Sequence, residues 1–366
     1  MYDLNNDLLA ISHSLLGIGH FRYACIACKL LLEASRTAKS DEKVTSMKIV
    51  TSSISCAEKY FKDAAAEGGN GDNTEQLKLF WRSAARYGRL EIMKWALRQG
   101  YAQVVWSDNR ELSSTVRFAA TICTTSAKYG QLDVLHWLRQ YNSCCWNFPW
   151  NSDTCAAAAH FGHLSCLQWL RENGCPWNAG TCSAAASGGH LSCLQWLRES
   201  GCPWNAYTCA AAARGGHLSC LQWLRESGCP WNADTCDAAA RGGHLSCLQW
   251  LRESECPWNA RTCSAAASGG RLSCLQWLRE SGCPWNAGAC SVAARGGHLA
   301  CLQWSRENGC KWDFTTCSAA ASGGHLSCLQ WARDNGCPWD EKIFYAAQRS
   351  GDPDVLDYVI QQGCPR

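Results

Sequence analysis

Cysteine is the residue type in this chain that most strongly invites a chemical interpretation. The sequence has 28 cysteines and 10 histidines in 366 residues, which is enough soft ligand for zinc sites or a disulfide framework. Twenty-two cysteines recur in three columns: Cys155, Cys182, Cys209, Cys236, Cys263, Cys290 and Cys317; Cys166, Cys193, Cys220, Cys247, Cys274, Cys301 and Cys328; and Cys175, Cys202, Cys229, Cys256, Cys283, Cys310, Cys337 and Cys364.

Substitutions within these columns favour buried packing over metal binding. The corresponding positions in the outer parts of the chain hold Ile92, Val134, Val355 and Phe344. A metal ligand does not exchange with such residues, whereas a small buried residue does. Neighbouring members of one column should lie about 8–10 Å apart, too far for the ~7 Å Cα separation of a disulfide. We predict reduced, buried thiols with no metal, no disulfide and no cofactor.

Histidine and tryptophan also recur, and each has a chemical and a structural interpretation. Six histidines occupy a Gly-His-Leu step, and Arg271 fills the same position once, which favours a hydrogen-bonding turn residue over a catalytic base. The tryptophans could stack nucleic-acid bases, but we expect no regularly interleaved basic residues, so core packing is favoured. The chain has no phosphate-cradling loop, zinc-protease motif or nucleophile elbow. We therefore predict no catalytic residues and no enzyme.

The element that positions all these residues is a 27-residue repeat. The tryptophan of its Leu-Gln-Trp step falls at Trp169, Trp196, Trp223, Trp250, Trp277, Trp304 and Trp331, and Tyr358 closes the series. A fixed period of this length indicates a solenoid, because one unit cannot bury its own apolar face. Such a fold offers an elongated binding surface.

One copy, Thr181–Tyr207, predicts two helices. The first is rich in alanine, begins near Thr181 as its N-cap and ends at Gly188-Gly189. The second runs from about Leu191 to Ser200, before Gly201 and Pro203 stop it. We expect Trp223, in the middle of the array, to pack between adjacent second helices and to stabilise the fold more than Trp95 does.

These residues resemble the ankyrin repeat. Ala185-Ala186, Gly189-His190, Cys193-Leu194, Trp196-Leu197, Gly201 and Asn205 fall at the spacings of its signature. The opening Thr-Pro-Leu-His tetrapeptide is missing, and the unit is about six residues shorter than the usual ~33. The resemblance implies an all-α solenoid with reduced β-turn fingers, of the short Cys-Pro-Trp type found in microbial eukaryotes and large DNA viruses.

The rest of the chain suggests three regions. Residues 151–366 hold eight regular repeats, the last a C-terminal cap, and residues 67–150 hold two degenerate repeats with insertions near Ala102–Ser114 and Ser143–Trp150. Residues 1–66 form a small helical region. It is either a cap for the repeats or a degenerate F-box, which it resembles in Leu8-Leu9, Ile11, Leu15-Leu16 and Cys28-Lys29.

The regular repeats differ at few positions, and those differences locate a candidate binding surface. They fall at three offsets, three and four residues apart, that share one face of the first helix. We name this face the first-helix stripe. The resemblance implies that first helices line a concave binding surface, and the stripe should be exposed, because no core position accepts Gly, Tyr, Asp and Arg in turn. The candidate partner-binding residues are Tyr207, Arg214, Asp234, Asp237, Arg241, Arg261 and Arg295.

Composition sets the expected partner and location. The net charge is only +3, and opposite charges lie side by side in the stripe, which favours a protein partner over a polyanion. We predict a monomeric, non-catalytic scaffold in the cytoplasm or nucleus, neither secreted nor membrane-bound. The alternatives are a substrate adaptor that recruits a ubiquitin ligase through residues 1–66 and, less favoured, a nucleic-acid-binding helical repeat.

Overall fold

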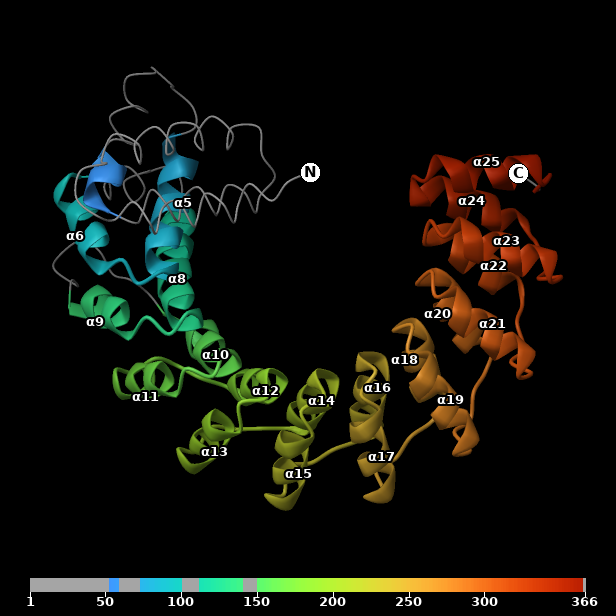
Figure 1. The fold of residues 1–366 in the computed structure, drawn as a ribbon, viewed down its shortest axis with the longest axis horizontal. Helices are drawn as coiled ribbons and strands as arrows, with labels where there is room; N and C mark the ends of the chain where they lie inside the picture. The colour runs from blue at the N-terminus through green and yellow to red at the C-terminus, as the bar shows by residue number, and fades with distance from the viewer. Residues whose placement is uncertain (1–52, 59–72, 101–111, 141–149, 365–366) are drawn as a thin grey trace, which may run out of the picture. The chain divides into compact units, whose positions relative to one another are not determined.

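The computed structural model describes residues 53–58, 73–100, 112–140 and 150–364. Every regular element in these ranges is a helix, which confirms the predicted all-α repeat fold (Figure 1). Consecutive pairs are joined without strands, as in the extended Cys202–Asn205 link, so the fingers are reduced as expected. Apart from a short helix over 54–58, the predicted cap or F-box-like segment lies outside the described residues.

The helices come in pairs, one pair for each repeat. The first helices of the pairs are α5 (Asn73–Arg86), α8 (Leu112–Lys128), α10 (Ser152–His160), α12 (Ala179–Gly188), α14 (Ala206–Gly215), α16 (Ala233–Gly242), α18 (Ala260–Ser268), α20 (Gly288–Arg295), α22 (Phe314–Ser322) and α24 (Glu341–Ser350). The second helices are α6 (Leu90–Arg98), α9 (Leu132–Gln140), α11 (Leu164–Glu172), α13 (Leu191–Glu199), α15 (Leu218–Glu226), α17 (Leu245–Glu253), α19 (Leu272–Glu280), α21 (Leu299–Glu307), α23 (Leu326–Asp334) and α25 (Pro353–Gln361).

The chain divides into two compact units. Unit 1 runs to Ala158 and includes Ser165–Pro176, and unit 2 contains Ala159–Leu164 and everything from Trp177 onward. In unit 1, α5 packs against α8 around the fully buried Phe80 and Trp81. Helix α8 begins at Leu112, so the last residues of the predicted Ala102–Ser114 insertion loop are helical. The predicted boundaries at residues 66 and 150 stay predictions.

The first helix of a regular repeat begins three residues earlier than predicted. In α12 the N-cap is Asn178, whose side chain accepts a hydrogen bond from the backbone N–H of Gly180 at 2.9 Å. Thr181, predicted to be the N-cap, is the third helical residue, and its buried hydroxyl accepts from the Asn178 N–H at 3.4 Å. This reciprocal pair is a capping box, in which the cap and the third residue each satisfy an otherwise free donor.

The predicted helix ends are confirmed. Gly189 adopts the left-handed conformation at the end of α12, with φ +77°, and Gly201 does so after α13, with φ +81°. A Cβ on Gly189 would lie 2.4 Å from Nδ1 of His217. The left-handed backbone and this close contact therefore both disfavour a larger residue at Gly189. The tight turn holds the two helices of a pair together.

Unit 2 has a dense inner layer and a looser outer one. The alanine-rich first helices pack directly against each other, because alanine lets two backbones approach closely. Within this unit they line the inner side of the arc, and the second helices line the outer side (Figure 1). Leu194 and Leu197 of α13 are fully buried between the layers, as are Ala185 and Ala186 of α12.

Tryptophan and arginine connect the outer layer. Trp204, in the link after α13, packs edge-to-face on Trp223 of α15 at 5.9 Å between ring centroids, and Arg198 of α13 lies 4.2 Å from the Trp204 ring centre. The same three-residue contact recurs at Arg225, Trp231 and Trp250, with distances of 4.2 and 5.7 Å. The expectation that no basic residue accompanies the tryptophans regularly was therefore wrong. We name this series the Trp–Arg ladder.

The Trp–Arg ladder also revises the predicted role of Trp223. Its side chain is half-buried, whereas Trp95 in unit 1 is 8% exposed and belongs to the core. The ladder instead joins consecutive second helices, which make few direct contacts with each other. An aromatic edge-to-face pair and a cation over a ring each contribute about 0.5–1.5 kcal/mol beyond burial.

The last pair, α24 and α25, has a buried and an exposed face, and its role as a C-terminal cap stays a prediction. Val355 and Val359 of α25 are buried, while Asp354, Asp357 and Gln361 are exposed. The helix starts with Asp352, which accepts from the N–H of Asp354 at 3.0 Å. Among the described residues, no helix is both long and apolar enough to cross a membrane.

Candidate binding surface

The first row of the stripe lies at the second residue of each first helix. Here the backbone N–H groups of Tyr207, Asp234 and Arg261 donate to the capping asparagine side chains at 3.0, 3.1 and 2.8 Å. Each backbone is therefore fixed by the same hydrogen bond, while the side chain is exposed, and Tyr207 is 67% exposed. This row presents different side chains from one geometry, as the sequence predicted.

The second row is less exposed than predicted. Ala210 is buried, and Ser183, Asp237 and Ser264 are half-buried between neighbouring first helices. The hydroxyls of Ser183 and Thr208 lie 3.2 Å apart, and the Thr262 hydroxyl donates to Asp237 at 2.7 Å. These side chains join one repeat to the next. The expectation that the whole stripe is exposed is therefore corrected for this row.

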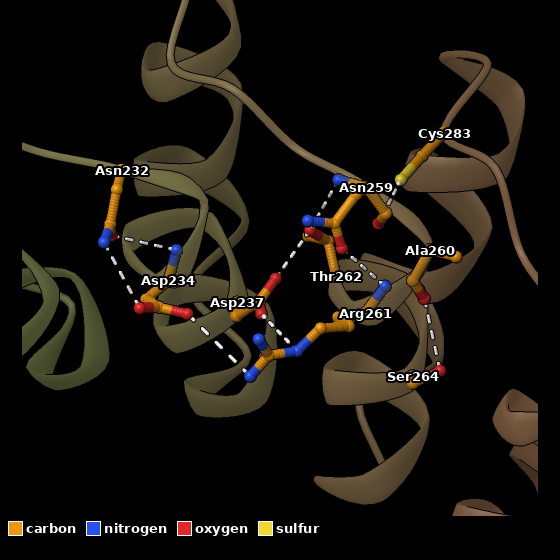
Figure 2. Close-up of polar contacts among 9 residues, drawn as sticks. All are labelled: Asn232, Asp234, Asp237, Asn259, Ala260, Arg261, Thr262, Ser264 and Cys283. Carbon is orange, nitrogen blue, oxygen red and sulfur yellow. Dashed lines mark hydrogen bonds and ion pairs between the residues drawn. The ribbon is translucent and has the colours of Figure 1, made fainter.

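Arg261 links the first two rows between α16 and α18, as Figure 2 shows. Its Nη2 lies 3.8 Å from Oδ1 of Asp234, and its Nε lies 3.7 Å from Oδ2 of Asp237. The Asp234 side chain is also held by Asn232, whose Nδ2 lies 3.3 Å from Oδ2. The exposed Arg261–Asp234 pair contributes about 0–1 kcal/mol, so it orients these groups more than it stabilises the fold.

Burial makes Asp237 the unusual carboxylate of this cluster. Its side chain is only 12% exposed. Burial raises the pKa of Asp237 above its usual range, and the hydrogen bond from Thr262 and the Arg261 charge oppose that rise. The equivalent position in neighbouring repeats is Ser or Ala. One central repeat therefore carries a charge at a site that the other regular repeats keep neutral.

The third row lies at the end of the first helix, next to the turn. Arg214, Arg241 and Arg295 are exposed there. Their backbone carbonyls face the next repeat, and His244 Nε2 lies 2.9 Å from the Arg214 carbonyl oxygen. Two other repeats hold Ser187 and Ser268 in this row. Their carbonyl oxygens lie 3.1 Å from Nε2 of His217 and of His298, the turn histidines of the following repeats. The predicted hydrogen-bonding role of the turn histidines is confirmed.

Arg271 belongs to this surface, although the sequence analysis left it out. It replaces the turn histidine, and its Nε donates to the Arg241 carbonyl oxygen at 3.3 Å. Unlike His217 and His244, which are half-buried, Arg271 is exposed. The sequence does indicate Arg271, because it is a cation at a position that histidine otherwise occupies. In the sequence this substitution served only as an argument against a catalytic histidine.

Pairs of cysteines contact each other inside the regular repeats, apart from the last, which has Phe344. The thiol of Cys182 in α12 is hydrogen-bonded to that of Cys202 in the link after α13, and Cys202 Sγ lies 3.5 Å from the Asn178 carbonyl oxygen. Each pair joins two different columns, so the spacing within one column does not indicate it. Every described cysteine is a free thiol. The pairs connect the end of one repeat to the start of its first helix.

The thiols of the second helices are poorly suited to nucleophilic chemistry. Burial raises the pKa of Cys220 to about 11, so its thiol is protonated at neutral pH. In the paired thiols the shifts oppose each other: the hydrogen bond between them raises the pKa of Cys229 and lowers that of Cys209. Within the described ranges, no cluster of three or more His, Cys, Asp or Glu side chains could hold a metal ion. The predictions of no metal, cofactor or catalytic residue stay predictions.

Comparison with known proteins identifies the repeat. A family model described as ankyrin repeats in many copies matches residues 154–198, 182–225 and 207–252. No curated protein matches the chain. Among solved structures, the ankyrin repeat domain of human ASB11 is similar with 19% identity and a TM-score of 0.40, covering 50% of this chain and 98% of that one.

The matched residues contain much of the candidate surface. Helices α12, α14 and α16 lie within them, with Tyr207, Arg214, Asp234, Asp237 and Arg241. The short Cys-Pro-Trp type and the F-box-like segment stay predictions. Residues 154–252 therefore match ankyrin repeats, the modules of protein-interaction scaffolds.

Proposed function

We propose that this chain is a non-catalytic scaffold that binds a partner protein on the first-helix stripe, which lines the inner, concave side of unit 2. The observation that carries this proposal is the contrast between fixed backbones and variable side chains. Tyr207, Asp234 and Arg261 occupy one structural position, each held by the same asparagine cap, yet they differ in shape and charge. Scaffolds that present variable side chains from a constant frame are suited to recognition.

The chemistry of the stripe supports a protein partner. Tyrosine and arginine are enriched among residues that dominate binding energy, and Tyr207 and Arg261 lie in the first row two repeats apart, with Asp234 between them. Tyr207 is among the few large apolar side chains that are strongly exposed in the described residues. An exposed aromatic side chain flanked by opposite charges suits a mixed-charge protein surface. We also propose that the chain is a monomer and is located in the cytoplasm or nucleus.

Capture with matched variants tests the proposal. The Tyr207→Thr, Arg261→Thr double variant installs the residue found at Thr315 in the same row, so the fold should be unaffected. We expect wild-type protein to capture a partner from the source cells and the double variant to bind that purified partner more than about tenfold more weakly. A control, Arg98→Ser and Lys311→Ser, changes exposed residues outside the stripe. Equal binding by wild type and stripe variant would refute the proposal.

The ubiquitin-ligase adaptor is a separate hypothesis about residues 1–66. It is motivated by the leucine pairs and Cys28-Lys29 in the sequence alone. A pull-down of the adaptor subunit of a ubiquitin ligase with the full chain and with a chain lacking residues 1–52 tests it. Capture that does not require those residues would eliminate this hypothesis and leave the stripe proposal intact.

A further inference from the structure

The charges of the first-helix stripe are segregated. Asp234 and Asp237 both lie against Arg261, so this cluster keeps one net negative charge. Arg214, Arg241 and Arg295 lie at the opposite ends of their helices, and Arg271 extends the same edge. We name these four arginines the turn row. Among the described residues, none of the four is in an ion pair.

One acidic residue, Asp237, lies near the turn row, and its charge interacts with that of Arg241. The rest of each helix–turn–helix elbow is free of Asp and Glu, in residues 208–225, 238–252, 262–279 and 289–306. The acidic residue nearest in sequence to Arg241 on its own helix is Asp237, one turn away, and it faces Thr262 and Arg261. The turn row is therefore a cationic edge across four consecutive helix pairs, although the whole chain has a net charge of only +3.

Backbone contacts hold this edge in register. The Arg214 and Arg241 carbonyls are fixed by His244 and Arg271 of the following repeats, at 2.9 and 3.3 Å. Neighbouring first helices pack at about 8–10 Å. Arg214 and Arg241 therefore start about one helix spacing apart. Helix α18 holds Ser268 in this row, and Arg271 reaches back from the following turn to the Arg241 carbonyl oxygen.

We propose that the turn row binds an extended acidic protein segment that carries a carboxylate at every third residue. A polyproline II segment has three residues per turn and rises about 3.1 Å per residue, so every third side chain returns to the same face after about 9 Å. That interval matches the helix spacing. Arginine also favours carboxylates through paired hydrogen bonds. This inference rests on the proposed function and names the chemistry of its partner.

A protein segment fits this edge better than a single-stranded nucleic acid does. Nucleic-acid grooves combine basic residues with aromatic platforms on which bases stack. The aromatic residue of the stripe, Tyr207, lies at the other end of its helix from Arg214. The tryptophans are on the second helices and in the links, where they contact each other and the ladder arginines.

Peptides of defined spacing test the proposal. Five Glu-Pro-Pro triplets, labelled with a fluorophore, would be titrated with the full chain at low salt and followed by anisotropy. The test variant combines Arg214→Ser, Arg241→Ser and Arg271→His, which restores residues found at these positions in other repeats. The control variant, Arg98→Ser, Lys311→Ser and Lys342→Ser, removes three exposed cations elsewhere. Circular dichroism melts verify that all proteins are folded.

We expect wild type and control to bind the peptide and the turn-row variant to bind about tenfold more weakly, with all binding lost near 1 M salt. Equal binding by wild type and turn-row variant would overturn the proposal. A peptide with its five glutamates in one block should bind more weakly, and equal affinity would overturn the three-residue spacing. Tighter, equally row-dependent binding of poly-uridine RNA would overturn the choice of a protein partner.

The same experiment separates this inference from the proposed function. If the captured partner depends on Tyr207 and Arg261 but no acidic peptide binds, the scaffold function stands and the acidic-segment inference fails. If the peptide binds through the turn row but the partner does not depend on the stripe, the acidic-segment inference stands and the scaffold function fails.

Discussion

The inner and outer layers of unit 2 use the same repeat in opposite ways. On the outer layer nearly every copy keeps the same leucines, tryptophan and arginine, and these residues contact each other along the Trp–Arg ladder. On the inner layer Tyr207, Asp234 and Arg261 replace one another at one capped position. A side chain that packs against its own copy in the next repeat must stay constant, whereas an exposed one is free to change.

Exceptions to the repeat sharpen this comparison, because each provides its own matched control. Ser305 stands where other second helices have leucine, Glu255 stands where other links have glycine, and Asp237 stands where other first helices have serine or alanine. If the layers differ as described, the first two exceptions should affect stability strongly and the third only slightly.

The largest expected effect lies in the leucine layer between the helices. Leu278 is fully buried, and Leu278→Ser should lower the free energy of unfolding by about 3–5 kcal/mol, through the lost apolar volume and a buried hydroxyl. Ser305 already has this arrangement, because its hydroxyl is fully buried without a hydrogen-bond partner. Ser305→Leu should therefore stabilise by about 1–2 kcal/mol. Denaturant melts measure both, and a neutral Leu278→Ser would contradict the packing.

Removal of a ladder tryptophan should have the next largest effect. Trp223→Ala removes a half-buried indole and its contact with Trp204, and should cost about 2–3 kcal/mol. Trp95→Ala removes an 8%-exposed indole and should cost more, about 3–5 kcal/mol. This reverses the order expected from the sequence. Urea melts of the two variants decide it, and a larger loss at Trp223 would restore the original expectation.

A smaller effect is expected at the backbone of one link. Glu255 has φ +61°, a left-handed conformation that glycine adopts in the equivalent links, as at Gly228 with φ +79°. Glu255→Gly should stabilise by about 1 kcal/mol by removing this strain, and Gly228→Glu should cost a similar amount. Thermal melts provide the comparison. A loss of stability on Glu255→Gly would show that the side chain contributes more than the strain costs.

The smallest expected effect is a pH dependence on the inner layer. The pKa of Asp237 is raised on folding, so the folded chain holds this proton more tightly than the unfolded chain. By linkage, wild type should lose stability relative to Asp237→Ser as pH rises from below the ordinary carboxyl pKa to above the raised one. Melts at several pH values, with both proteins compared, measure this difference. A loss of wild-type stability relative to Asp237→Ser as the pH falls would contradict the assigned shift.

Much of the fold followed from the sequence because the signals are local and repeated. Gly189 and Gly201 marked helix ends, and Leu194 and Leu197 marked a buried face, since each depends on its immediate neighbours in the chain. The helix start at Asn178 was missed because Thr181 also has the chemistry of a cap. Which of two cap-forming residues begins a helix depends on a reciprocal hydrogen bond that the order of residues does not reveal.

The sequence by itself determined the repeat and its two helices. It also showed that the position of Tyr207 accepts different side chains and that His217 lies in a turn. Tertiary structure alone decided which residues of different repeats meet. It placed Arg198 over Trp204, buried Asp237 beside Thr262, paired Cys182 with Cys202, and set Arg271 beside Arg241. The physical reason is that the period fixes what each residue is within its own repeat, whereas contacts between repeats depend on how far one helix pair is rotated and displaced relative to the next.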